Sequence, residues 1–420
     1  MQVFVLLLSS LLEHAVVATK SQDELVLAQV IWRHGSRAPT DTYPRNPNTE
    51  KAWPLGMGQL TKRGMDQSVE LGKTLKELYI DKEDPLISPF PVSGEYRIQS
   101  TEFDRVMASA AGVAAGMFPK FDGAAAQNYL VPIFANNLTT DADLNIFISC
   151  PRYDEFVDDA FVKLAKLEND HKWLFDLAKQ NTGKNYTLRN IWEVYDNYAC
   201  DSLENLKPAT WLTPAVLKVM KKLIDVELEA LLGLLFEEDK FRQHTRLRGD
   251  RTLKTFVDLF AKRIKCDGND SPDCVKTNKL KFYGYSAHDL TIAHMMTTMT
   301  RDLRFIVPGY MVDYMGAFSF ELWKRNGKFD LRILYRPGEG TRFKPVTGQI
   351  IQSESEYWDF EDFLSRVTPY IPQDFESECS PKKLVREKRN YKPDPSLSER
   401  RYPGWDVALK TNTPNEHVEV

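Results

Sequence analysis

The sequence predicts an α/β fold, with a mixed central sheet, helices on both faces and an inserted, mostly helical cap domain. Three observations lead to this fold class. Patterns of buried strands stop abruptly at polar residues and are followed by helical segments, as in open α/β sheets. A long helical section separates the early strands from the late ones. The late strands are joined by an Asn-Gly turn that is typical of an antiparallel hairpin.

The first strand is expected at residues 25–32, which read Leu-Val-Leu-Ala-Gln-Val-Ile-Trp. An almost continuous apolar run that includes β-branched residues fits a strand buried on both faces. The run ends at Arg33 and His34, so polar groups follow the carboxyl end of the strand, where open α/β sheets bind ligands. A helix is then expected at residues 61–80, with apolar side chains along one side.

Two more strands are expected at residues 96–100 and 279–285. The first leads into an Ala-rich helix through residues 106–113. The second runs into Ser-Ala-His-Asp at 286–289 and a helix that begins near Leu290. Because free N–H groups and the helix dipole favour anions at a helix N-terminus, this junction is a candidate anion site.

The section between these strands is largely helical over residues 126–277. Its clearest element is the segment 214–238, where apolar residues that we expect in the core recur at helical spacing. These are Val219, Leu223, Val226 and Ala230. Strands return at 318–323 and 331–335 and form the expected hairpin. We therefore divide the chain into a signal peptide (1–18), an α/β core (22–125 and 278–379), a helical cap (126–277) and a polar C-terminal tail (380–420).

The N-terminus carries a short apolar core, and Val16 and Ala18 suit the positions before signal-peptidase cleavage, although a buried helix is the alternative. No later stretch approaches about 18 unbroken apolar residues, so we expect no membrane anchor. We expect a secreted or lysosome-like protein. Fifty-five basic and 59 acidic residues leave a net charge of −4. This balance argues against nucleic acid as a partner.

Five cysteines agree with an oxidising compartment. Cys266 and Cys274 bracket a turn-rich loop that a local disulfide would close. A zinc knuckle is the rival, but no second Cys or His pair has ligand spacing, so we expect no metal. Three sequons, at Asn137, Asn185 and Asn269, are candidate glycosylation sites if the chain is secreted.

Arg33, His34 and Arg37 place two cations and an imidazole within five residues. Attack on a phosphate monoester needs positive groups that neutralise the anion, and the arginine fork binds two phosphate oxygens at once. Gly35 is expected to permit a tight turn. A short Arg-His-Gly segment alone is most often a surface loop. The longer string after a buried strand, together with the distant His-Asp pair at 288–289, favours catalysis.

These motifs resemble the histidine acid phosphatase family of the histidine phosphatase superfamily, including its secreted prostatic-type and nematode members. The resemblance covers roughly residues 25–380 and implies an α/β sheet with an inserted helical cap. The stretches that carry it are Arg-His-Gly-Ser-Arg-Ala-Pro at 33–39, Gly-Gln-Leu-Thr at 58–61, Ser100-Thr101, Asp104-Arg105 and Ser-Ala-His-Asp at 286–289.

The resemblance implies that His34 is the nucleophile that forms a phosphohistidine and that Asp289 gives a proton to the leaving alcohol. Arg33, Arg37 and His288 match the phosphate-binding groups of the family. A neutral imidazole can attack phosphorus, whereas a protonated one binds its oxygens. An acidic optimum is therefore expected, and no metal or other cofactor is needed.

One departure from the family concerns Gln99, which stands where the family usually has another phosphate-binding arginine, immediately before the Ser-Thr pair. Loss of that contact would cost on the order of 3 kcal/mol, or about a hundredfold in rate. Arg97 lies two residues earlier and shares a strand face with Gln99. Our hypothesis is that Arg97 partly substitutes for the missing group, and the alternative is a solvated or salt-bridged Arg97.

Another departure concerns the cysteines. Cys150 and Cys379 match a family pair that would tie the cap to the C-terminal segment. Cys200 matches a family cysteine whose partner would fall near Ala317, so it is left as a free, buried thiol or pairs between chains.

The leading interpretation is an acid phosphatase that acts on a small phosphate monoester or on a phosphorylated protein or lipid. A phytase-like enzyme is the alternative within the family, and Gln99 argues against the strongly basic pocket that it needs. A weakly active or inactive secreted binding protein is the alternative outside enzymes, supported by Gln99 alone. The oligomeric state is left open, a homodimer included.

Overall fold

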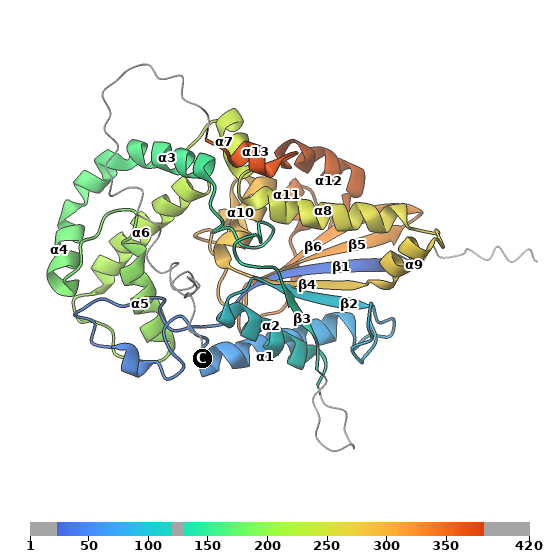
Figure 1. Cartoon of the computed structure of the whole chain (residues 1–420), viewed down its shortest axis with the longest axis horizontal. Coiled ribbons are helices and arrows are strands. Elements are labelled where there is room, and N and C mark those ends of the chain that lie inside the picture. Colours follow the sequence, from blue (N-terminus) through green and yellow to red (C-terminus); the bar gives the residue numbers. More distant parts are fainter. Residues whose placement is uncertain (1–22, 120–129, 382–420) are drawn as a thin grey trace, which may run out of the picture.

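The computed structural model describes residues 23–119 and 130–381 (Figure 1). The α/β class is confirmed: in these ranges an eight-stranded mixed sheet has helices on both faces. The strand order is β3-β2-β4-β1-β5-β6-β7, and β8 pairs with β6. The predicted signal peptide and nearly all of the predicted tail lie outside the described residues.

The parallel half of the sheet contains the strands that the site depends on. Central β1 (Glu24–Arg33) runs parallel to β4 (Phe282–Ala287), which runs parallel to β2 (Tyr96–Ser100). The three predicted strands are therefore present, although β4 begins later than expected because α9 (Pro272–Lys279) occupies the first position. Edge strand β3 (Ile133–Ala135) was not predicted and lies in the interval assigned to the cap.

The antiparallel half begins with β5 (Ala317–Arg325), which pairs with the other side of β1. The predicted hairpin is confirmed, because β5 pairs with β6 (Lys328–Arg336) across Asn326 and Gly327. Both turn residues have positive φ, 50° and 79°, as a two-residue turn with the strand twist requires. Short strands β7 (Lys344–Pro345) and β8 (Trp358–Asp359) complete this half.

Each face of the sheet has its own apolar core. Helices α1 (Lys62–Tyr79) and α2 (Asp104–Met117) cover the face of β1 that carries Val30 and Trp32. The opposite face is covered by α8 (Gly249–Lys265), α10 (Asp289–Thr300) and α12 (Phe360–Val367). The remaining short elements are α11 (Thr347–Ile351), α13 (Phe375–Cys379) and 3-10 turns at Glu50–Ala52, Leu303–Phe305 and Thr368–Tyr370.

Helices α3 to α7 form a separate cluster beside the sheet, with their own core (Figure 1). Their bounds are Pro151–Asp170, Lys172–Thr182, Trp192–Leu203, Pro214–Leu231 and Glu238–Thr245. The helix expected over 214–238 ends at Leu231, shortly before Gly233 with φ 76°. Two of its four expected core residues are buried and two are half-buried. Helix α8, which falls inside the predicted cap interval, packs instead on the sheet through Phe256 and Phe260.

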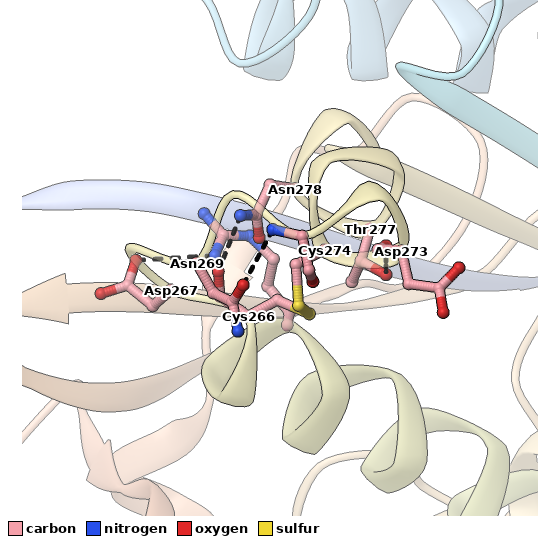
Figure 2. Close-up of a disulfide and its surroundings, with 9 residues drawn as sticks. Cys266, Asp267, Asn269, Asp273, Cys274, Thr277 and Asn278 are labelled. Carbon is pink, nitrogen blue, oxygen red and sulfur yellow. Dashed lines mark hydrogen bonds and ion pairs between the residues drawn. A yellow bond between two sulfur atoms is a disulfide. The ribbon is translucent and has the colours of Figure 1, made fainter.

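Both expected disulfides are present. Cys150 is bonded to Cys379, which joins the start of α3 to α13, and Cys266 is bonded to Cys274 (Figure 2). The amide of Asn278 donates to the carbonyl oxygen of Cys266 over 2.7 Å and braces the smaller loop. Because both thiols of this loop are oxidised, it does not take the alternative zinc-knuckle form. Across the described ranges, no helix combines the length and the apolar character needed to cross a membrane.

Candidate active site

The sequence-predicted site residues meet at the carboxyl ends of β1 and β4. Arg33 is the last residue of β1, and the backbone N–H of His34 donates to the carbonyl oxygen of Ala287 on β4 over 3.1 Å. The rings of His34 and His288 lie 5.6 Å apart between centroids. Two segments that are far apart in the sequence are therefore held together by the parallel pairing of their strands.

His34 is buried, with 3% of its surface exposed. Its Nδ1 lies 2.9 Å from the carbonyl oxygen of Gly35. This contact assigns the proton to Nδ1 and leaves the lone pair on Nε2. Burial, followed by the charges of Arg105 and Arg33, lowers the pKa of His34 well below its usual value. The lowered pKa favours the neutral form of this imidazole.

Gly35 is required for a reason that the sequence did not reveal. A Cβ at this position would lie 2.3 Å from the carbonyl oxygen of Gly64 at the start of α1, and a Cβ on Gly64 would meet the carbonyl oxygen of Ser36. Gly35 is not among the residues with positive φ. The expected role in a tight turn is corrected to close backbone approach, since α1 packs directly against the loop.

Arg33 is tied in three directions. Its Nη2 pairs with the Asp289 carboxylate at 2.8 Å, and its Nη1 donates to the carbonyl oxygen of Val312 at 2.9 Å. The guanidinium also stacks 4.0 Å above the centroid of the Tyr314 ring. The buried Nε–H has no acceptor among the described residues. A buried donor without a partner is costly, which marks a place for an anionic acceptor.

Arg37 is held in the same way. Its Nη1 and Nη2 form two parallel bonds, 2.9 and 3.0 Å long, to the carboxylate of Asp196 on α5. Its buried Nε–H is likewise left without an acceptor in the described structure. Burial alone would lower the pKa of Arg37, but Asp196 and Tyr314 raise it well above its usual value. Arg37 thus keeps its charge, and each of the two arginines has a spare donor.

Arg105 is the site residue that sequence reasoning missed. It lies in the first turn of α2, and its Nε is 3.4 Å from Nε2 of His34. Burial and the neighbouring Arg37 lower the pKa of Arg105 to about 10, so it is still a cation at any acidic or neutral pH. The Asp-Arg pair at 104–105 was among the matching motifs, but it was given no role.

His288 caps α10, and its Nε2 lies 3.0 Å from Oγ1 of Thr101. Phe103 and Phe147 contact its ring edge-on, with centroids 5.1 and 5.2 Å away. Burial, followed by the charges of Arg105 and two more arginines, lowers the pKa of His288 well below its usual value. The expected positive charge on this ring therefore requires a bound anion.

Gln99 and Arg97 share the Tyr283 hydroxyl as a hydrogen-bonding partner. The Tyr283 hydroxyl donates to Oε1 of Gln99 over 2.6 Å, and Nε of Arg97 donates to the same hydroxyl over 3.0 Å. The Arg97 guanidinium stacks 3.9 Å from the centroid of Phe134. The structure thus connects Arg97 to Gln99 through Tyr283, whereas Arg105 is the arginine that lies within hydrogen-bonding distance of His34.

The three sequon asparagines, Asn137, Asn185 and Asn269, are all exposed, and Asn269 lies in the loop closed by the smaller disulfide (Figure 2). Exposure is necessary for glycosylation, which stays a prediction.

The chain matches the family model of the histidine phosphatase superfamily (branch 2) over residues 24–336. The chain belongs to this family. The matched range begins at β1 and ends with β6, so it includes the sheet strands that carry the site and the helical insertion between them.

Among similar proteins, the lysosomal acid phosphatase of Xenopus laevis is 29% identical over 383 residues, covering 89% of this chain and 82% of its own. The prostatic acid phosphatase of Homo sapiens is 27% identical over 386 residues, covering 90% and 92%. The apo form of the Hafnia alvei phytase superposes with a TM-score of 0.57 at 14% identity, over 85% of this chain and 98% of that one. At this identity the structural likeness shows a shared fold alone.

Proposed function

We propose that this protein is an acid phosphatase that hydrolyses phosphate monoesters through a phosphohistidine at His34. The family is one of phosphatases, and the Xenopus laevis and Homo sapiens proteins named above are acid phosphatases. The observation that carries the proposal is a neutral, buried His34 whose electrostatic neighbours are Arg33, Arg37 and Arg105. Such a site combines a nucleophile with the charge that a phosphate dianion needs.

Substrate binding uses the donors that the free site leaves without acceptors. The Nε–H groups of Arg33 and Arg37 are buried and unpaired among the described residues, and phosphate oxygens would accept from them. Arg105 adds a third cation beside the attacking nitrogen. This third cation argues against an inactive binding protein, because that alternative depended on a missing arginine at Gln99.

In the first step, Nε2 of His34 attacks phosphorus, the P–N bond forms and the P–O bond to the alcohol breaks. Asp289, at the start of α10, is a carboxylate paired with Arg33 in the free site, so it first takes a proton from the acidic solution and then passes that proton to the leaving oxygen. In the second step, water attacks phosphorus and Asp289 takes a proton from it. The P–N bond then breaks, which releases inorganic phosphate and restores the neutral imidazole of His34.

His288 couples phosphate binding to the uptake of a proton. Burial and the arginines hold its pKa low in the free site, but a phosphate dianion close to the ring would favour the protonated form. Substrate binding would therefore be accompanied by uptake of a proton at His288. Acid supplies that proton, which gives a physical reason for an acidic optimum.

The compartment follows from the same set of observations. Two disulfides in the described residues suit an oxidising environment, and the similar proteins include lysosomal and prostatic acid phosphatases. We therefore propose a secreted or lysosome-like location. The substrate class is a small phosphate ester or a phosphorylated protein or lipid.

Hydrolysis of p-nitrophenyl phosphate between about pH 3 and about pH 8 tests the proposal. We expect an acidic optimum and a loss of at least about 10⁴-fold in kcat for His34→Ala, because the covalent step loses its nucleophile. His171→Ala, which removes a histidine of the cap, is the matched control and should keep the activity. Turnover that survives in His34→Ala would contradict the proposal, and preference for inositol hexakisphosphate would indicate the phytase-like alternative.

A further inference from the structure

Helix α5 of the cap presents one face to the phosphate loop. Asp196 and Cys200 on α5 (Trp192–Leu203) and Glu204, the residue that caps its C-terminal end, recur every four residues, which places them on one side of this helix. Asp196 and Cys200 both contact Arg37, and Glu204 accepts from the Ser36 hydroxyl at 3.4 Å. The loop that carries the nucleophile is therefore backed by a helix from a different part of the chain.

The strongest of these contacts is the pair between Asp196 and Arg37. The two bonds engage the Nη1 and Nη2 end of the guanidinium and are 2.9 and 3.0 Å long. Side-chain exposure is 9% for Arg37 and 15% for Asp196, so the pair is shielded from water. A planar, bidentate pair fixes the orientation of the whole guanidinium, because the group cannot rotate without breaking both bonds.

The bonds to Asp196 leave a defined edge of Arg37 unused. The Nη1 nitrogen also donates to the carbonyl oxygen of Ala38 at 3.1 Å and contacts the Cys200 sulfur at 3.7 Å. The Nε nitrogen is buried and has no acceptor in the described structure. The partners supplied by the protein thus gather at one end of the guanidinium, and the Nε edge is free for a ligand.

We propose that Asp196 is a positioning residue that holds Arg37 by its Nη end, so that the Nε edge stays available to the phosphate. This inference rests on the proposed function of the site. It gives the cap a part in phosphate binding. It also predicts that Asp196 affects phosphate affinity only through Arg37.

A double-mutant cycle separates this role from support of the fold. Its variants are Asp196→Asn, Arg37→Ala and the combination, and its readout is the Kd of inorganic phosphate measured by calorimetry at acidic pH. Asparagine keeps the shape of the side chain but offers one acceptor and turns an amide donor toward the arginine fork. We expect Asp196→Asn to weaken phosphate binding about tenfold when Arg37 is present. In the Arg37→Ala background the same change should leave the affinity equal or improve it, because it removes an unpaired carboxylate from an anion site.

Glu193→Gln is the matched control. Glu193 is a buried carboxylate on the same helix, but its partner is Lys184, at 2.7 Å, and not the phosphate loop. Its loss should leave phosphate affinity within about twofold. Asp196→Glu keeps the negative charge and should recover part of the phosphate affinity. If Asp196→Asn does not fold, Asp196→Glu replaces it in the double-mutant cycle.

Each result bears on the positioning role of Asp196, on the proposed phosphatase activity, or on both. Equal losses with and without Arg37, or an equal loss in Glu193→Gln, would overturn the positioning role of Asp196. A wild-type protein that binds phosphate without hydrolysing esters would overturn the proposed function, while the binding cycle still decides the role of Asp196. A wild-type protein that binds no phosphate would overturn both.

Discussion

The structure contains two pairs of neighbouring buried histidines, and only one of these pairs belongs to the candidate active site. His34 and His288 lie 5.6 Å apart at the carboxyl edge of the sheet. His244 on α7 and His294 on α10 stack with centroids 6.2 Å apart, where the cap meets the sheet domain. All four rings are buried, and burial is the largest cause of the lowered pKa of each.

The surroundings of the two pairs differ. The charges of three arginines act on His34, and the buried Nε–H groups of Arg33 and Arg37 have no acceptor in the described structure. The rings of Tyr153, Phe156 and Phe236 surround His244, and Arg248 is the cation that lowers its pKa after burial. A low histidine pKa is therefore common to the pair that we propose as catalytic and to a pair that only packs. Spare cationic donors and a nearby carboxyl group separate the two.

Among the changes that test this comparison between the two histidine pairs, Arg105→Ala has the largest expected effect. If arginines with spare donors distinguish the candidate active site from the packing pair, Arg105 should matter for catalysis. Arg105→Ala should then lower kcat/KM for p-nitrophenyl phosphate by about a hundredfold to a thousandfold, because a donor beside the attacked phosphorus is lost. Steady-state kinetics at the optimum measures this effect, with thermal unfolding to check the fold. A change of less than about threefold would remove Arg105 from the site.

The next effect concerns the packing pair. His244→Ala should lower the free energy of unfolding by about 2–4 kcal/mol, because it leaves a cavity among aromatic rings. Urea unfolding measures this change, and kcat of the folded protein should stay within about threefold of wild type. A large fall in kcat without loss of stability would show that the second pair takes part in the chemistry.

A smaller effect is the pH dependence that His244 contributes to stability. Burial and Arg248 lower the pKa of His244 to about 3, whereas an unfolded histidine titrates at about 6.5. Below about pH 6.5 the unfolded chain therefore binds a proton that the native state does not. Stability from this residue is complete above that pH and falls by about 1.4 kcal/mol per unit as the pH drops toward 3. The slope of the unfolding free energy against pH reports how many more protons the unfolded chain binds than the native state. In His244→Leu this number should fall by about one, and an unchanged slope would refute the lowered pKa of His244.

The smallest effect concerns Arg97 and Gln99. Because Arg97 is bound to Tyr283 and stacked on Phe134, Arg97→Ala should change kcat/KM by less than about twofold. Gln99→Arg should likewise bring little gain, since Arg105 already supplies the third cation. A gain of about tenfold or more in Gln99→Arg would restore the view that this position limits turnover.

Much of the fold, and the site residues at 33–37 and 288–289, could be predicted from the sequence because they depend on local patterns. The apolar run of β1, the Asn-Gly hairpin and the segment 33–37 each carry their information within a few residues. Parallel strands ending at one edge then bring 288–289 to the same place. These features needed no knowledge of which helix packs where.

The remaining features depend on tertiary contacts. Arg105 is one residue in a helical first turn. The pair Asp104-Arg105 is among the motifs shared with the family, but its local pattern does not show that α2 directs Arg105 toward His34. The pairing of Arg37 with Asp196 joins residues 159 positions apart across the boundary between cap and sheet. Gly35 is required because the backbone of α1 packs directly against it, and the residues around Gly35 do not indicate this contact.

The most direct test of the central claim is to trap the phosphorylated enzyme. Asp289→Asn should accumulate the intermediate with p-nitrophenyl phosphate, because this good leaving group needs little acid help while the second step loses its base. Rapid quenching followed by peptide mass spectrometry should find one phosphoryl group on His34, and none after His34→Ala. Turnover with phosphate found on another residue, His294 included, or on no residue at all, would contradict the account.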